Sequence, residues 1–124
     1  MDIAFRVAEQ SYANNAKVGA VMVRGDNIIA LGYNGTPKGW SNQCEEPHYL
    51  CTLNEDGSGC SCESDGPCPV ELRTKPEVLH AESNMLAKVA KSTQSSEGTT
   101  VYTTLAPCLD CAKLMYQSLS LIHI

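Results

Sequence analysis

The chain has 124 residues, of which 43% are apolar and 19% are charged, and this length suits one domain with a single core. Its net charge of −5 and pI near 5.0 argue against long nucleic acids as substrates, because these require a basic surface. A small anionic substrate is still allowed, because one or two local cations can hold a phosphate. No apolar run approaches the ~20 residues of a membrane span, and the N-terminus lacks the features of a signal peptide. We therefore expect a cytoplasmic protein, without a membrane partner, that forms one domain over residues 1–124.

The first part of the chain predicts a helix followed by a β-hairpin. Residues 2–16 place apolar side chains at intervals that suit an amphipathic helix. Residues 18–23 are apolar and rich in β-branched side chains, which predicts a buried strand, and turn residues at 24–27 lead into a second strand over residues 28–33. The short turn predicts an antiparallel pair. The glycine-rich residues 32–39 that follow are either a tight turn or a ligand-binding loop.

Residues 41–79 are the least regular part of the chain, and they contain many of its seven cysteines. Because no export signal accompanies these cysteines, metal binding explains at least two of the seven better than a disulfide scaffold does. The segment has few core residues, so a metal or a crosslink would help it to fold. Two interpretations stay open: a flexible insertion with free thiols, or a second, structural zinc with ligands drawn from His48, Cys51, Cys60, Cys62 and Cys68.

The last third of the chain predicts a helix, a strand and a second helix. Residues 80–92 carry an apolar helical stripe, and residues 99–105 are β-branched and aromatic, as in a strand. A helix is expected after Cys111. The strand delivers Pro107 and Cys108 at its carboxyl end, which is the usual place for a site in an α/β sheet.

Two short motifs in this region predict a catalytic zinc site: His80-Ala81-Glu82 and Pro107-Cys108-Leu109-Asp110-Cys111. Imidazole and two thiolates suit zinc, and three protein ligands leave the fourth position for a water molecule that Glu82 would deprotonate. Pro107 suits the first turn of a helix, which would place both sulfurs on one face and near the positive end of the helix dipole. We expect His80 and Glu82 at the start of their helix, with the metal beyond its end.

The spacing H-x-E followed by P-C-x-x-C is typical of zinc-dependent nucleobase deaminases. The alternatives are a redox pair, or a structural zinc with a fourth cysteine such as Cys68. Neither alternative explains a glutamate two residues after the histidine or a proline before the first cysteine. The sequence therefore favours a catalytic zinc with Glu82 as its base.

Further stretches extend this pattern over nearly the whole chain: Lys17-Val18-Gly19-Ala20-Val21, Gly32-Tyr33-Asn34-Gly35-Thr36-Pro37 with Gly39, Cys44, and Thr104-Leu105-Ala106 before Pro107. With these stretches the chain resembles the deoxycytidylate (dCMP) deaminases of bacteria and bacteriophages, within the cytidine deaminase superfamily. The zinc motifs alone do not separate these from cytidine, adenosine, guanine or tRNA deaminases. The Gly-Tyr-Asn-Gly-Thr-Pro loop selects dCMP deaminase.

The resemblance implies an α/β/α sandwich with a five-stranded mixed sheet, and deamination of dCMP to dUMP in pyrimidine deoxynucleotide metabolism, toward dTTP. It implies His80, Cys108 and Cys111 as ligands of Zn²⁺, with Glu82 as the proton shuttle. It also implies that Asn34 binds the deoxyribose, with Ala81 and Thr36 as further substrate contacts. Family members are often hexamers that dCTP activates and dTTP inhibits, and part of the glycine-rich loop is linked to the regulatory site.

The sequence departs from the family in two places. Ser118-Leu119-Ser120 replaces an expected Ser-Gly-Ile turn, so we expect the C-terminal strands of the family to be missing and the chain to end in an unrelated segment, in which His123 has no role. Such a sheet would expose an apolar edge. The cysteine-rich insertion at 41–79 is the second departure.

The substrate and its phosphate site stay open in part. Four cations are candidates for the phosphate: Arg24, Lys38, Arg73 and Lys75. The alternative functions are deamination of another cytosine nucleoside or nucleotide, and an inactive zinc-binding homologue that senses nucleotides. If the chain comes from a bacteriophage, its compartment is the host cytoplasm.

Overall fold

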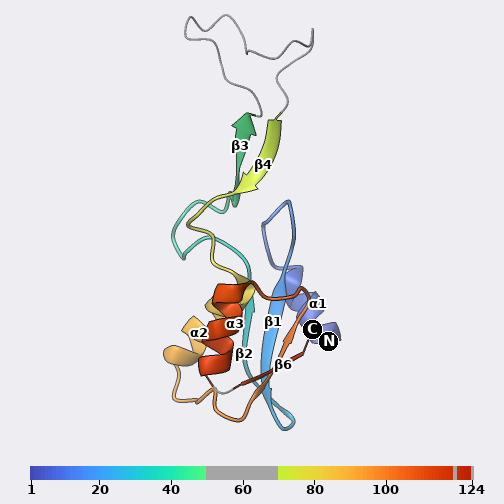
Figure 1. The fold of residues 1–124 in the computed structure, drawn as a ribbon, viewed down its shortest axis with the longest axis vertical. Helices are drawn as coiled ribbons and strands as arrows, with labels where there is room; N and C mark the ends of the chain where they lie inside the picture. The colour runs from blue at the N-terminus through green and yellow to red at the C-terminus, as the bar shows by residue number, and fades with distance from the viewer. Residues whose placement is uncertain (50–69, 119, 124) are drawn as a thin grey trace, which may run out of the picture.

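The structure is a computed structural model that describes residues 1–49, 70–118 and 120–123 (Figure 1). It contains three helices and six strands in these residues. In chain order they are α1 (Asp2–Ala8), β1 (Gly19–Arg24), β2 (Asn27–Tyr33), β3 (Glu45–Tyr49), β4 (Val70–Thr74), α2 (Ala81–Ala90), β5 (Thr100–Thr103), α3 (Leu109–Gln117) and β6 (Leu121–His123).

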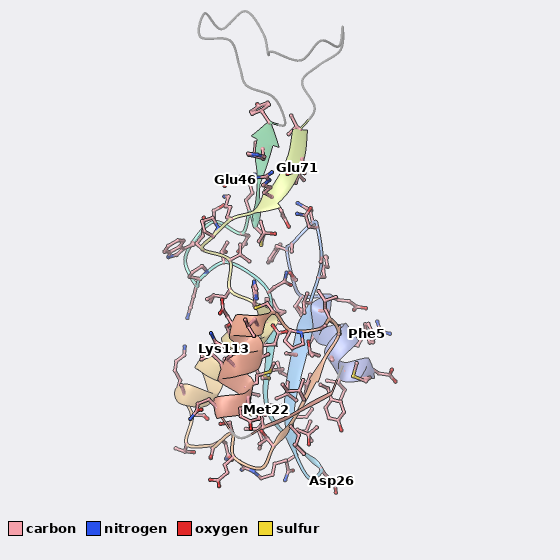
Figure 2. All side chains as sticks on the ribbon, in the orientation of Figure 1. Phe5, Met22, Asp26, Glu46, Glu71 and Lys113 are labelled. Atoms are coloured by element: carbon pink, nitrogen blue, oxygen red, sulfur yellow. The ribbon has the colours of Figure 1, made fainter. Side chains whose placement is uncertain are left out.

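The main sheet has the strand order β2-β1-β5-β6. The central strand β1 is antiparallel to β2 and to β5, whereas β5 and β6 are parallel, so the sheet is mixed. The predicted antiparallel hairpin over residues 18–33 is confirmed. Its turn carries Asp26, at the end of the molecule opposite the β3–β4 ribbon (Figure 2). The resemblance implies five strands, and the described residues supply four to this sheet.

Helices cover both faces of the sheet. Successive side chains of β1 point to opposite faces, and both sets are apolar and need to be buried. Val21 packs with Ala4 and Val7 of α1 on one face. Met22 belongs to the larger cluster on the other face, which includes Met85 of α2 and Met115 of α3 (Figure 2 labels Met22). The three-layer α/β/α architecture that the resemblance implies is confirmed.

Two glycines let the helices approach the sheet closely. A Cβ at Gly32 of β2 would lie 2.3 Å from the carbonyl oxygen of Ala81 and 2.6 Å from the backbone nitrogen of Met85. A Cβ at Gly19 would lie 2.1 Å from the carbonyl oxygen of Ala4 in α1. Real Cβ atoms do not approach backbone so closely, so glycine at these positions sets the separation between the layers.

The first helix is shorter than predicted, because α1 ends at Ala8 and not near residue 16. The hydroxyl of Ser11 accepts a hydrogen bond from the backbone N–H of Ala13 at 3.1 Å and donates one to the carbonyl oxygen of Asn34 at 2.7 Å. A serine that bonds to nearby backbone competes with the helical ladder. Residues 11–18 therefore form an irregular segment that leads to β1.

Two further strands, β3 and β4, lie in the segment that the sequence assigned to no regular element. They pair antiparallel as a two-stranded ribbon that extends away from the main sheet (Figure 1). The register places Glu45 opposite Thr74 and His48 opposite Glu71. Four of the five candidate ligands of a second zinc, Cys51, Cys60, Cys62 and Cys68, lie outside the described residues.

No regular element is predicted for residues 121–124, yet residues 121–123 are a strand. They form β6 beside β5, and the backbone N–H of Leu121 donates to the carbonyl oxygen of Thr99 at 2.8 Å. Strand β6 also contacts α3, so residues 121–123 extend the sheet under that helix. None of the helices in the described part of the chain has the length and hydropathy that a membrane crossing requires.

Candidate metal centre and adjoining cleft

The metal-ligand candidates come from the N-termini of two helices that start side by side. His80 is the N-cap of α2 and Cys108 is the N-cap of α3, both with extended backbone. Cys111 lies in the first turn of α3 and is buried. Nδ1 of His80 lies 3.4 Å from each of the two cysteine sulfurs. The structure therefore brings the three predicted ligands together at one point.

The spacing of these atoms fits a zinc ion. Two ligands at Zn–S of about 2.3 Å and Zn–N of about 2.0–2.1 Å lie about 3.6 Å apart in a tetrahedron. The observed nitrogen–sulfur distances of 3.4 Å are close to that value, and all three ligand atoms lie within 4.8 Å of one another. Among the described residues, no other group of three or more His, Cys, Asp or Glu side chains is arranged to hold a metal.

The surroundings of the sulfurs differ from the sequence expectation in two ways. Pro107 precedes the N-cap and does not occupy the first turn, because Cys108 itself caps α3 by accepting from the backbone N–H of Cys111 at 3.5 Å. Burial raises the pKa of the Cys111 thiol to about 11, whereas the sequence predicts that the helix dipole favours the thiolate. A bound cation would oppose this shift because it stabilises the thiolate.

Glu82 lies beside the metal-ligand group in a cleft of about 260 Å³. It is in the first turn of α2 and is only 3% exposed. The hydroxyl of Thr103, at the end of β5, donates to its Oε1 at 3.4 Å. The cleft is lined by Asn15, Ala16, Val18, Asn34, Thr74, Val78, His80, Ala81, Glu82, Leu105, Ala106 and Cys108.

Asn34 and Ala81, two of the predicted substrate contacts, both line this cleft. Asn34 also has a structural task that the sequence did not reveal. Its Oδ1 accepts from the backbone N–H of Val18 and its Nδ2 donates to the carbonyl oxygen of Ala16, both at 2.8 Å. Asn34 therefore fixes the segment before β1 and presents only its remaining hydrogen-bonding capacity to the cleft.

Thr36, the third predicted substrate contact, is not among the residues that line this cleft. It lines a second cavity of about 520 Å³ with Lys38, Lys88 and Lys91. Lys88 donates to the carbonyl oxygen of Leu31 at 2.9 Å and lies 5.5 Å from the ring centre of Tyr33. No acidic side chain lines this cavity in the described part of the chain, so it is a basic hollow on a protein of net negative charge.

The four candidate phosphate ligands are dispersed. Arg24 binds Gln94, at 3.3 Å, and the adjacent backbone, and Arg73 pairs with Glu71 on the ribbon. Lys38 lines the second cavity. Lys75 is half-buried and directly follows Thr74, which lines the cleft.

The remaining zinc candidate in the described residues, His48, is exposed on β3. It is not part of a metal-ligand group formed by the described residues. The second structural zinc stays a prediction, because its other candidate ligands lie outside these residues.

Sequence reasoning missed two buried polar residues near the cleft, Thr103 and Glu45. Thr103 was read only as a strand residue, although a hydroxyl two residues before the end of that strand was a usable signal. Glu45 follows Cys44 in a segment that has no clear periodicity, and nothing in the sequence indicates that its carboxylate is buried.

Comparison with known proteins agrees with this geometry. Residues 1–121 match the family model of the cytidine and deoxycytidylate deaminase zinc-binding region. Deoxycytidylate deaminase of Enterobacteria phage T4 is 35% identical over 137 residues, covering 95% of this chain and 70% of that protein. The Homo sapiens deoxycytidylate deaminase is 34% identical over 120 residues, covering 95% of this chain and 57% of that protein.

A solved structure is also similar. The crystal structure of dCMP deaminase from cyanophage S-TIM5, in complex with dCMP and dUMP, has a TM-score of 0.73 to this chain at 37% identity. The alignment covers 96% of this chain and 71% of that chain. The similarity predicted from the sequence motifs is confirmed.

Proposed function

Because the chain belongs to the cytidine and deoxycytidylate deaminase zinc-binding family, we propose that it hydrolyses dCMP to dUMP and ammonia. The observation that carries the proposal is the convergence of His80 Nδ1 on the sulfurs of Cys108 and Cys111, next to a buried glutamate in a nucleotide-sized cleft. The family match over residues 1–121 supports our expectation of one such domain. We place the reaction in the synthesis of pyrimidine deoxynucleotides, in the cytoplasm.

His80, Cys108 and Cys111 would hold Zn²⁺, which supplies a Lewis acid that activates the attacking water molecule. Glu82 takes a proton from that water as the water oxygen bonds to C4 of the cytosine ring, and passes this proton to N3. Glu82 then carries the proton of the new C4 hydroxyl to the exocyclic amine, and the C4–N bond breaks to release ammonia. Its burial removes competing solvent and keeps the carboxylate close to the reacting atoms.

We assign the recognition of the nucleotide to the walls of the same cleft. The free hydrogen-bonding capacity of Asn34 suits a deoxyribose hydroxyl, and the backbone N–H of Ala81 is at the start of α2, where such groups have no intrahelical partner. Lys75 is the best placed of the four cations for the phosphate, because it adjoins the cleft wall.

Regulation by dCTP and dTTP would use the second cavity. Its three lysines supply the charge that a triphosphate requires, and Thr36, Pro37 and Gly39 of the glycine-rich loop form one side of it. Assembly into a homo-oligomer, a hexamer by family resemblance, belongs to the same proposal. Addition of dCTP should then lower the dCMP concentration needed for half-maximal rate, and Lys91→Ala should reduce that response.

The experiment that tests the proposed activity combines zinc content with turnover of dCMP, followed by the loss of cytosine absorbance. Glu82→Gln should keep the zinc and lower kcat about 10²-fold to 10⁴-fold, the usual contribution of a general acid–base. Glu97→Gln, at an exposed loop position, is the matched control and should change neither quantity. A zinc-loaded wild-type protein that turns over deoxycytidine but not dCMP would point to another deaminase of the family. Zinc without turnover of any cytosine nucleotide would favour the inactive homologue.

A further inference from the structure

Glu45 is a buried carboxylate to which the proposed reaction gives no task. It begins β3, is 2% exposed, and forms no ion pair among the described residues. A buried carboxylate is stable only where hydrogen bonds replace the water it loses. Its partners therefore indicate what it does.

The carboxylate of Glu45 holds the segment before β1 through hydrogen bonds. Its Oε1 accepts from the backbone N–H of Asn14 at 2.8 Å and from that of Asn15 at 3.1 Å. Its Oε2 accepts from Nδ2 of Asn14 at 3.3 Å. The held segment lines the cleft through Asn15 and Ala16, whereas Glu45 itself does not.

Glu45 also ties the held segment to the ribbon that carries another cleft residue. In the ribbon it pairs with Thr74, which lines the cleft, and Nδ2 of Asn15 donates to the carbonyl oxygen of Leu72 on the same strand at 2.8 Å. Glu45 thus holds residues 14 and 15 against the ribbon strand that carries Thr74. Since residues 14–16 form no regular secondary structure, these hydrogen bonds fix the position of this part of the cleft lining.

We propose that Glu45 is a positioning residue for substrate binding, which holds the cleft residues Asn15 and Ala16 in place against the ribbon. This proposal rests on the proposed function. Glu45 lies outside the metal-ligand group and has no contact with Glu82 in the hydrogen bonds of the structure. Its removal should therefore weaken binding of the nucleotide and spare the chemical step.

The test is a comparison of Glu45→Ala, Glu45→Gln and Glu46→Gln in steady-state turnover of dCMP, with zinc content and melting temperature of each variant. Glu45→Ala should raise KM about tenfold or more and change kcat less than about threefold, the signature of lost binding that is equal in ground and transition states. Glu45→Gln keeps one acceptor but places an amide donor against the donors of Asn14, so its KM should be intermediate. Glu46 lies on the exposed ribbon (Figure 2), and its variant should match the wild type.

Hydrogen exchange provides a readout that does not depend on activity. The amides of Asn14 and Asn15 should exchange faster in Glu45→Ala, while the amide of Met22 in the central strand keeps its protection. The proposal would be overturned if Glu45→Ala showed faster exchange but a KM within twofold of the wild type. An equal fall in kcat and zinc content of this variant would also overturn it. If Glu45→Ala does not fold, Glu45→Gln decides by the same criteria.

Failure of the proposed function is distinguishable from failure of this inference. A wild-type protein that binds dUMP in calorimetry without turning over dCMP contradicts the activity alone, and the affinity of the Glu45 variants for dUMP then replaces KM. A wild-type protein that neither binds dUMP nor turns over dCMP overturns both the proposed function and the proposal for Glu45.

Discussion

The hydroxyl of Thr103 lies 3.4 Å from Oε1 of Glu82 and 2.9 Å from the carbonyl oxygen of Leu105. Thr103 is fully buried at the end of β5, and Glu82 is buried at the start of α2. The strand and the helix therefore meet at the carboxylate that we assign to proton transfer. Leu105 itself lines the cleft, so the same hydroxyl also fixes the start of the loop that leads to Cys108.

Thr103→Val should lower kcat about tenfold without loss of zinc. Valine has nearly the same shape, so the change removes the hydroxyl, whose one proton Glu82 and the carbonyl oxygen of Leu105 share, and leaves the packing of β5 in place. A hydrogen bond to a charged group contributes about 1.5–3 kcal/mol, and the long distance here places the effect near the lower end of that range. Thr100→Val, on the same strand, is the control. A kcat within twofold of wild type would show that Thr103 does not position Glu82.

Removal of a single sulfur should release the catalytic metal. Cys108→Ala leaves the N-cap of α3 without its acceptor and the metal with two protein ligands, so zinc content should fall by about one equivalent per chain. Cys44→Ala is the matched control, because Cys44 is buried away from the metal-ligand group and should leave the zinc content unchanged. Elemental analysis of both proteins checks the prediction. Full retention of zinc in Cys108→Ala would remove Cys108 from the ligand set.

Local signals explain what the sequence predicted well. The hairpin over residues 18–33 follows from two apolar runs joined by a short turn. The position of His80 at the start of a helix follows from the apolar helical stripe in the residues after it. The convergence of His80 with Cys108 and Cys111 could be predicted from two short motifs. Ligands of one zinc ion must lie close together, even when they are far apart in the sequence.

What the sequence did not reveal depends on tertiary contacts. The end of α1 at Ala8 is set by Ser11, whose hydroxyl bonds to Asn34, a residue 23 positions away. The pairing of β3 with β4 joins segments that are far apart in the sequence, Glu45–Tyr49 and Val70–Thr74, and no short hairpin turn links them. Glutamate is mostly a surface residue, and the burial of Glu45 becomes favourable through hydrogen bonds from the backbone of Asn14 and Asn15 and from the side chain of Asn14.

The thiol of Cys44 should make stability fall at alkaline pH. Burial, and then the charge of Glu45, raise the pKa of Cys44 above its ordinary value of 9.0. At neutral pH the thiol is protonated in both folded and unfolded chains and contributes no pH dependence. As the pH rises through 9.0, the unfolded chain loses this proton first, so the folded state loses stability relative to it. Wild type should therefore lose more unfolding free energy than Cys44→Ala between about pH 7 and pH 10. Parallel curves for the two proteins would contradict this origin of the effect.

Gly32→Ala in β2 should destabilise the protein more strongly than a substitution at a nearby glycine in the loop after that strand. The new Cβ would meet backbone atoms of Ala81 and Met85 at 2.3 and 2.6 Å, so α2 would have to move away from β2. Overpacking of this kind costs about 1–3 kcal/mol, and more where the obstacle is backbone. Because α2 carries His80 and Glu82 at its start, zinc affinity and kcat should fall together with the melting temperature.

Gly35→Ala is the matched control for this substitution. A Cβ at Gly35 has no heavy atom within 4 Å, and the residue does not need a positive φ. Its variant should melt within a few degrees of the wild type and keep its zinc. Equal melting temperatures for Gly32→Ala and the wild type would mean that α2 can shift without cost, and the close contact between helix and strand would then not be what positions the metal-ligand group.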